Sequence, residues 1–154
     1  MSESEQYLLC LGICVEAHKG QTGKFSKEPY SNHPIRVSKN RRISSESELG
    51  CTSRCAALLH DVIEDTSMTP LDLLEAGVSK DIIYMVNLLT RSKSESYFQY
   101  IIRLSRLQGS AEYFIKLIKM ADLDDNLRDL EPGSLRDKYE LSKHILYESC
   151  YGEV

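Results

Sequence analysis

Apolar residues recur along most of the chain at intervals of three and four positions, the spacing that places them on one face of an α-helix. The first such segment covers residues 4–18, with Tyr7, Leu8, Leu11 and Val15 on one face. Further helices are predicted from residue 32 onward and over residues 52–65, 70–76, 80–90, 95–107, 111–127 and 135–150. No alternating run is long enough to indicate a strand. The pattern therefore predicts an all-α fold, a compact helical bundle with short connections.

Polar and turn-forming residues separate these helices. Residues 19–32 (KGQTGKFSKEPYSN) carry two glycines and a proline, which is typical of an ordered loop. Thr69 and Pro70 are the N-cap and first residue of a short helix that ends at Gly77. Ser79 is the N-cap of the next helix. Tyr97 is interpreted as a core residue of the helix over residues 95–107.

Composition restricts the class of protein. The chain has 154 residues, of which 42% are hydrophobic, which fits a single domain over residues 1–154 with a C-terminal helix and tail at 131–154. The net charge of −4 and the absence of a large basic cluster argue against a nucleic-acid partner. No segment approaches the roughly 20 apolar residues of a membrane span, and the acidic start does not resemble a secretory signal. The five cysteines are interpreted as reduced residues of a cytoplasmic protein, and no particular oligomeric state is indicated.

Four ionisable residues crowd the segment LLHDVIEDT, residues 58–66. On a helical wheel His60, Asp61, Glu64 and Asp65 share the side opposite the apolar residues. A solvated face is one interpretation of this side. However, no cation in the segment neutralises the three carboxylates, and the helix dipole disfavours anions near a C-terminal end. A bound divalent cation would resolve both problems.

Ligands from other segments must complete such a metal site. His33 lies in the first turn of the helix predicted from residue 32, and Asp122 follows an apolar run in IKMADLDDN. A set of imidazole and carboxylate ligands suits manganese, iron, zinc or nickel better than calcium or magnesium. A metal of this kind lowers the pKa of bound water and polarises a phosphoryl oxygen, and Glu64 is one helical turn from His60.

Three stretches resemble a known family: AHKGQTGKFSKEPYSNHPIRV, AALLHDVIEDT and IKMADLDDNLRDL. Together they are similar to the successive signatures of the HD-domain phosphohydrolases, in the RelA/SpoT-type alarmone hydrolase branch, across residues 17–130. LTRSKSESYFQY also resembles a stretch of the small single-domain members. The resemblance implies an HD-domain helical fold and a metal, typically manganese, held by four residues: His33, His60, Asp61 and Asp122. It implies that Glu64 and Asp65 serve the hydrolytic water.

The resemblance also implies a substrate and a reaction. Family members remove pyrophosphate from the 3′ position of ppGpp or pppGpp, the nucleotide alarmones of the stringent response, and leave GDP or GTP. Lys24 matches a lysine that faces the substrate phosphates, and Asn126 matches an asparagine of the substrate pocket. Arg91 is a candidate phosphate contact, with a surface salt bridge as the alternative. His18 is a candidate for the pocket region, with a structural hydrogen bond that ties the loop as the alternative.

The chain departs from the family pattern at two places, and the first of them keeps other functions open. Gly23 stands where the family loop commonly has an arginine that helps to hold the nucleobase, and the usual ADRLHN is here ADLDDN, with Asp124 and Asp125. A second hypothesis is therefore an HD-type phosphohydrolase of another nucleotide, such as a nucleoside monophosphate or the 2′-phosphate of NADPH. A third is a domain that binds a nucleotide without turnover, against which the Glu64–Asp65 pair argues.

Overall fold

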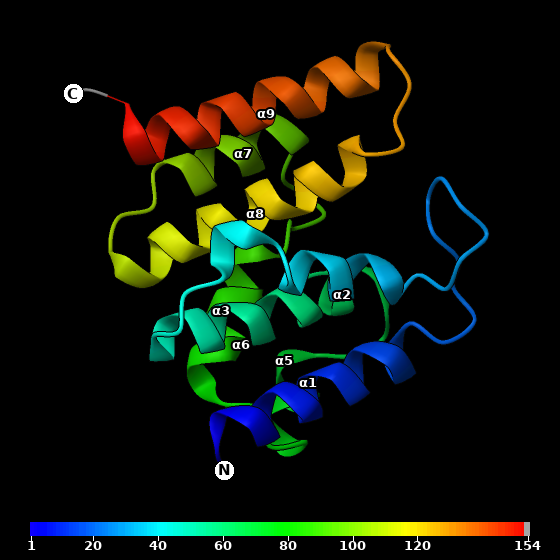
Figure 1. Ribbon diagram of the computed structural model, residues 1–154, viewed down its shortest axis with the longest axis vertical. Coiled ribbons are helices and arrows are strands. Elements are labelled where there is room, and N and C mark those ends of the chain that lie inside the picture. Colours follow the sequence, from blue (N-terminus) through cyan, green and yellow to red (C-terminus); the bar gives the residue numbers. More distant parts are fainter. Residues whose placement is uncertain (153–154) are drawn as a thin grey trace.

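Helices make up nearly all the regular structure of the computed structural model, which describes residues 1–152 (Figure 1). In chain order the elements are α1 (Glu3–Ala17), α2 (Asn32–Ser38), the 3₁₀ helix η1 (Arg41–Ile43), α3 (Glu48–Leu59), α4 (Val62–Asp65), α5 (Pro70–Glu75), α6 (Lys80–Leu89), α7 (Tyr97–Ser105), α8 (Ser110–Leu127) and α9 (Ser134–Tyr151). Within residues 1–152 no strand forms, and one isolated bridge between Thr22 and Pro29 closes the loop after α1. The all-α prediction is confirmed.

The helices stack in layers around α3 and α8. Figure 1 shows α1 and α9 at opposite ends of the molecule, with α2, α3 and α6 between α1 and α8. Helix α3 contacts α1, α2, α6 and α8, while α7 and α9 pack on the other side of α8. The last turns of α3 are fully buried, at Ala56, Ala57, Leu58 and Leu59. Because α3 is central, the segment that follows it begins inside the protein.

Most predicted helix boundaries are confirmed. The Thr69 hydroxyl accepts from the Asp72 N–H at 3.2 Å, while the Asp72 carboxylate accepts from the Thr69 N–H at 2.7 Å. Pro70 begins α5, and Gly77 follows its end with φ +98°. Ser79 caps α6 through the Ile82 N–H. These caps are local interactions, which the spacing of the residues predicts well.

The predicted single helix over residues 52–65 is wrong. Helix α3 begins earlier, at Glu48, and ends at Leu59, and a separate turn, α4, follows. The His60 Nδ1–H donates to the Ala57 carbonyl at 2.6 Å, the oxygen that the Asp61 N–H would use in a continuous helix. The helix is therefore interrupted at His60 and Asp61, so a wheel for one continuous helix does not describe how the four ionisable residues are arranged.

Two further sequence predictions concern the cysteines and the C-terminal segment. All five cysteines are free thiols, and Cys10, Cys14 and Cys55 are buried, as expected for reduced core residues. Helix α9 packs against α7 and α8, and residues 153–154 of the predicted tail lie outside the described residues. Among residues 1–152 no helix combines the length and apolar character needed to cross a membrane.

Candidate active site

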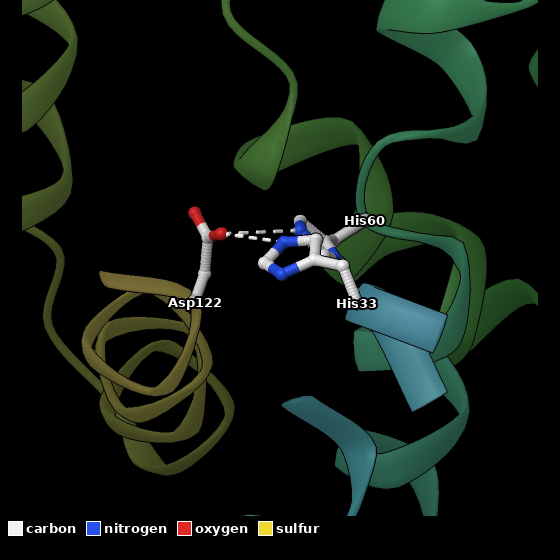
Figure 2. A group of neighbouring side chains, drawn as sticks. All are labelled: His33, His60 and Asp122. Atoms are coloured by element: carbon white, nitrogen blue, oxygen red, sulfur yellow. Dashed lines mark ion pairs between the residues drawn. The ribbon is translucent and has the colours of Figure 1, made fainter. Parts of the chain in front are cut away.

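Three buried side chains from distant parts of the sequence meet beside α8. His33 comes from the first turn of α2, His60 follows α3, and Asp122 lies on α8. Figure 2 shows both imidazole rings turning a nitrogen toward the Asp122 carboxylate. The distance to Asp122 Oδ1 is 2.9 Å from His33 Nε2 and 3.5 Å from His60 Nε2. One ligand atom from each residue lies within 4.8 Å of the other two, a spacing that can hold a single metal ion.

The second ring nitrogens determine which atoms face the centre. His60 Nδ1 donates to the Ala57 carbonyl, and His33 Nδ1 donates to Asp125 Oδ2 at 2.7 Å. The Nε2 lone pairs therefore point at the centre. His60 Nε2 is buried without a hydrogen-bond partner of good geometry, although Asp61 Oδ2 lies 3.0 Å away. A divalent cation would satisfy this nitrogen, so the residues fit a metal of the class predicted from the sequence.

The charges of the cluster also favour a cation at its centre. Burial opposes protonation of His33 and His60, yet the pKa of each is raised because carboxylates surround both rings. Asp122 and Asp125 act on His33, and Asp61 and Asp122 act on His60. Carboxylates outweigh the cost of burying positive charge here, which is the environment that a metal site requires.

Asp61, the fourth predicted ligand, lies at the edge of this group. Its Oδ2 is 3.8 Å from His33 Nε2 and accepts a hydrogen bond from the Tyr30 hydroxyl at 2.5 Å. Burial would raise the pKa of Asp61, but the neighbouring histidines, His60 above all, lower it, so the carboxylate is ionised. Its role as a ligand is a proposal that rests on this proximity.

Asp122 is held through both of its oxygens. Lys119 Nζ donates to Oδ2 at 2.6 Å, and the Asn126 amide donates to Oδ1 at 2.8 Å. Burial disfavours the charged forms, yet the pKa of Lys119 is well above and that of Asp122 well below the usual value, because each stabilises the charge of the other. Asn126, predicted to contact a substrate, thus also orients the carboxylate.

The departure ADLDDN is matched by arginines from the preceding segments. Asp125 accepts from Arg36 Nε at 2.8 Å as well as from His33, and Asp124 accepts from Arg42 Nε at 2.7 Å. Burial alone would raise the pKa of Asp125, but its bonds to His33 and Arg36 bring it to about 2. Asp125 is therefore a charged residue that fixes the His33 ring.

A cavity of about 280 Å³ opens next to the three-residue cluster. Glu64 and Asp65 border it, and the backbone N–H of Arg91 donates to Glu64 Oε1. Partial burial raises the pKa of both carboxyls, and the charge of Asp61 adds to the effect. A carboxylate with a raised pKa accepts a proton more readily, which suits a general base.

Three of the four residues predicted to contact the substrate line the cavity, and the fourth, His18, does not. Lys24, Arg91 and Asn126 line the cavity. Burial lowers the pKa of Lys24, but Asp61 and Asp122 raise it overall, so the ammonium is charged. His18 does not line the cavity, and its role in substrate binding stays a prediction.

His18 supports the loop instead. The His18 ring is buried with its centre 4.8 Å from that of Tyr30, and its Nδ1 lies 2.9 Å from Gln21 Oε1. Tyr30 in turn donates to Asp61. The contact with Gln21 fits the structural interpretation, and the contact with Tyr30 places His18 behind the candidate site.

Several cavity residues were not predicted. Tyr97, expected in the core, lines the cavity together with Tyr139, Lys119 and Lys138. The sequence could have indicated Lys119, because it lies one turn before Asp122 on the same helix face. Nothing in the sequence indicates Lys138 and Tyr139, since α9 resembles an ordinary amphipathic helix.

Relatives among known proteins cover most of the chain. No family model matches it. The chain is 36% identical over 134 residues to the guanosine-3′,5′-bis(diphosphate) 3′-pyrophosphohydrolase MESH1 of Drosophila melanogaster, an alignment that covers 83% of this chain and 71% of the relative. The Xenopus tropicalis protein of that name is 33% identical over 138 residues, covering 84% and 72%. The chain belongs to the guanosine-3′,5′-bis(diphosphate) 3′-pyrophosphohydrolase family.

Other members of this 3′-pyrophosphohydrolase family are much longer. The bifunctional (p)ppGpp synthase/hydrolase SpoT of Escherichia coli K12 is 37% identical over 134 residues, and the matched region is 18% of its length. A solved structure described as a metazoan ortholog of SpoT that hydrolyses ppGpp superposes with a TM-score of 0.75 at 28% identity, over 96% of this chain and 86% of that one. The family predicted from the sequence motifs and the HD-domain fold are confirmed.

Proposed function

We propose that the protein removes pyrophosphate from the 3′ position of ppGpp and pppGpp, leaving GDP and GTP, with a bound divalent ion that is manganese. The observation that carries the proposal is the His33–His60–Asp122 cluster opening on a cavity bordered by Glu64 and Asp65. The named activity of the MESH1 relatives, which this chain matches over most of its length, supports the choice of substrate.

The metal would be held by His33, His60 and Asp122, with Asp61 as the fourth ligand. When bound, such an ion lowers the pKa of a coordinated water and polarises a phosphoryl oxygen. The protein's contribution is orientation: Ala57 and Asp125 fix the two rings, while Lys119 and Asn126 fix the carboxylate of Asp122.

Glu64 and Asp65 would receive the proton of the attacking water. The water oxygen bonds to the phosphorus attached to the ribose 3′ oxygen, and the bond between that phosphorus and the 3′ oxygen breaks. The 3′ oxygen then takes a proton, so that pyrophosphate and a free 3′ hydroxyl result. The raised pKa of both carboxyls lets them hold the proton, and the Arg91 N–H keeps Glu64 at the cavity edge.

The cavity can accept a polyanion because its charges balance. Four carboxylates line it, and so do four cations. Bound metal adds further positive charge, so a nucleotide with several phosphates meets a net positive surface. This balance was not evident from LLHDVIEDT alone, since the cations come from other segments.

A turnover screen with added manganese tests the proposal directly. We expect the purified protein to release pyrophosphate from ppGpp and pppGpp, to lose this activity on chelation and to recover it when manganese is returned. The panel would include NADPH and nucleoside monophosphates. Phosphate release from one of these, with ppGpp untouched, would contradict the proposed substrate, and no turnover of any compound would contradict the enzymatic function.

Substitution of Lys24 by methionine should raise KM for ppGpp more than it lowers kcat. The Lys24 ammonium makes no ion pair with a carboxylate within residues 1–152 and faces the cavity. Loss of one charge-assisted phosphate contact corresponds to about 1.5–3 kcal/mol, or roughly ten- to hundredfold in kcat/KM. Steady-state kinetics would measure it, with Lys27→Met as the control, since Lys27 is exposed and does not line the cavity. An equal effect of both substitutions would contradict a specific role for Lys24.

A further inference from the structure

Most acidic residues that line the cavity come from one segment, and most basic residues that line it come from later elements. Three of the four carboxylates, Asp61, Glu64 and Asp65, come from the segment that follows α3. Three of the four cations come from later elements: Arg91 after α6, Lys119 on α8 and Lys138 on α9. The cavity thus has a cationic side formed by the later elements.

Lys138 faces the cavity from α9. Its Nζ lies 4.0 Å from the centre of the Tyr97 ring. Among residues 1–152 no carboxylate lies within ion-pair distance of it, in contrast to Lys143 on the same helix, which pairs with Asp124 and Glu140. A cation–π contact holds an ammonium in place but leaves its N–H groups free to donate. Lys138 is therefore a positioned cation whose N–H groups are available to an anion.

Lys119 connects this side to the metal cluster. Its Nζ donates to Asp122 Oδ2 and lies 5.3 Å from the centre of the Tyr100 ring, at a partly buried position that lines the cavity. Asp122 accounts for one of the three ammonium N–H groups. An anion bound in the cavity next to the His33–His60–Asp122 cluster has both Lys119 and Lys138 in the lining around it.

The opposite side of the cavity is shaped differently. Lys24 and Asn126 border both the cavity and an adjoining hollow of about 30 Å³, which is also lined by Gly23 and Phe25 of the loop after α1. The cavity therefore continues toward this loop at Lys24 and Asn126, whereas Lys119 on α8 and Lys138 on α9 line the cavity without bordering the hollow. A compact, highly charged group fits these two ammonium groups better than a nucleoside does.

We propose that Lys119 and Lys138, with Tyr97 holding Lys138, form a subsite for inorganic pyrophosphate, the diphosphate part of the substrate that is released. The inference rests on the proposed function for the identity of the ligand. It assigns to the α8 and α9 residues the recognition of a diphosphate in preference to a single phosphate. Two ammonium groups in one cavity can each donate to one phosphate of a diphosphate, and each charge-assisted hydrogen bond strengthens in a partly buried site.

Product inhibition tests the subsite. In assays with manganese in excess over pyrophosphate, Lys138→Met should raise the inhibition constant of pyrophosphate about tenfold or more. The inhibition constant of GDP and the metal affinity should not change. Methionine keeps most of the length of the side chain but removes the ammonium, and Lys138→Arg should restore much of the affinity. Lys143→Met, on the same helix but outside the cavity, is the matched control.

Lys119→Met distinguishes an anion-binding role from a purely structural one. If Lys119 binds pyrophosphate, its loss should weaken pyrophosphate at least tenfold while manganese still binds. If Lys119 only holds Asp122, manganese affinity should fall and pyrophosphate binding should fall only with it. An unchanged pyrophosphate affinity in both lysine variants, or an equal loss for GDP, would overturn the proposal.

Calorimetric titration of pyrophosphate into the manganese-loaded protein separates this inference from the proposed function. Binding that depends on Lys138, in a protein that does not hydrolyse ppGpp, would support the subsite and refute the substrate. Hydrolysis of ppGpp together with pyrophosphate binding that ignores Lys138 would support the substrate and refute the subsite.

Discussion

Replacing Glu64 by glutamine should lower kcat for ppGpp by about 10²- to 10⁴-fold, the range in which a general base contributes. Glutamine has nearly the same shape and can still contact the Arg91 N–H, but it cannot take a proton from water. Glu64 is outside the His33–His60–Asp122 cluster, so manganese affinity should be unchanged. The measurement is single-turnover kinetics of the metal-saturated protein, paired with a metal titration.

Comparison with Asp65→Asn shows which of the two carboxylates acts as the general base. A larger loss in Glu64→Gln than in Asp65→Asn would identify Glu64 as the base, and the reverse result would identify Asp65. Glu46→Gln, at an exposed position outside the cavity, removes the same charge and should leave kcat unchanged. Full activity in both cavity variants would refute the catalytic assignment.

Replacing His60 by alanine should abolish the stabilisation of the protein by manganese. A ligand present at 100 times its dissociation constant stabilises the folded state by about 2.7 kcal/mol. For a chain of this length that corresponds to a rise in Tm of roughly 5–10 °C. His60 presents a buried Nε2 to the centre of the cluster, so its loss removes a ligand, and the metal-induced shift should vanish.

The metal-induced shift in Tm, rather than Tm itself, is the informative quantity. His60→Ala also removes the hydrogen bond to Ala57 and leaves a buried gap, so the metal-free variant will melt at a different temperature from the native protein. Asp122→Asn changes almost no volume and should lose the shift as well, while His144→Ala, at an exposed position of α9, should retain it. A full manganese shift in both cluster variants would refute the metal site.

Manganese titration and the manganese-induced shift in Tm also test the role of Asp61. It lies 3.0 Å from His60 Nε2 but also accepts the Tyr30 hydroxyl. If it is the fourth ligand, Asp61→Asn should lower manganese affinity by an amount comparable to that in Asp122→Asn. If it only anchors Tyr30, the affinity should change little and the loop after α1 should loosen.

The helices of this protein were readily predicted from its sequence. Their apolar periodicity and their caps at Thr69 and Ser79 depend on residues within a few positions of one another. The motifs around His33, His60 and Asp122 likewise carry their own local signature, which is why the family and the candidate metal residues could be recognised before the fold was known.

The break at His60 could not be predicted in the same way. Periodicity over residues 52–65 favours one helix, because it does not register a side chain that competes for a backbone carbonyl. The contact of His18 with Tyr30 could not be predicted either. A role in the pocket and a structural hydrogen bond both place His18 near the loop after α1, so the sequence does not distinguish them. In each case a single side-chain contact decides the geometry.

By itself the sequence determined the helical class, most of the boundaries, the family and the residues of the candidate metal cluster. Only the tertiary structure decided that Lys119 and Asn126 orient Asp122, that Asp125 orients His33, and that Lys138 faces the same cavity as Lys24. The physical reason is that these contacts depend on how α2, α8, α9 and the loop after α1 pack around α3. Local periodicity records which face of a helix is buried, but not which side chain of another element it meets.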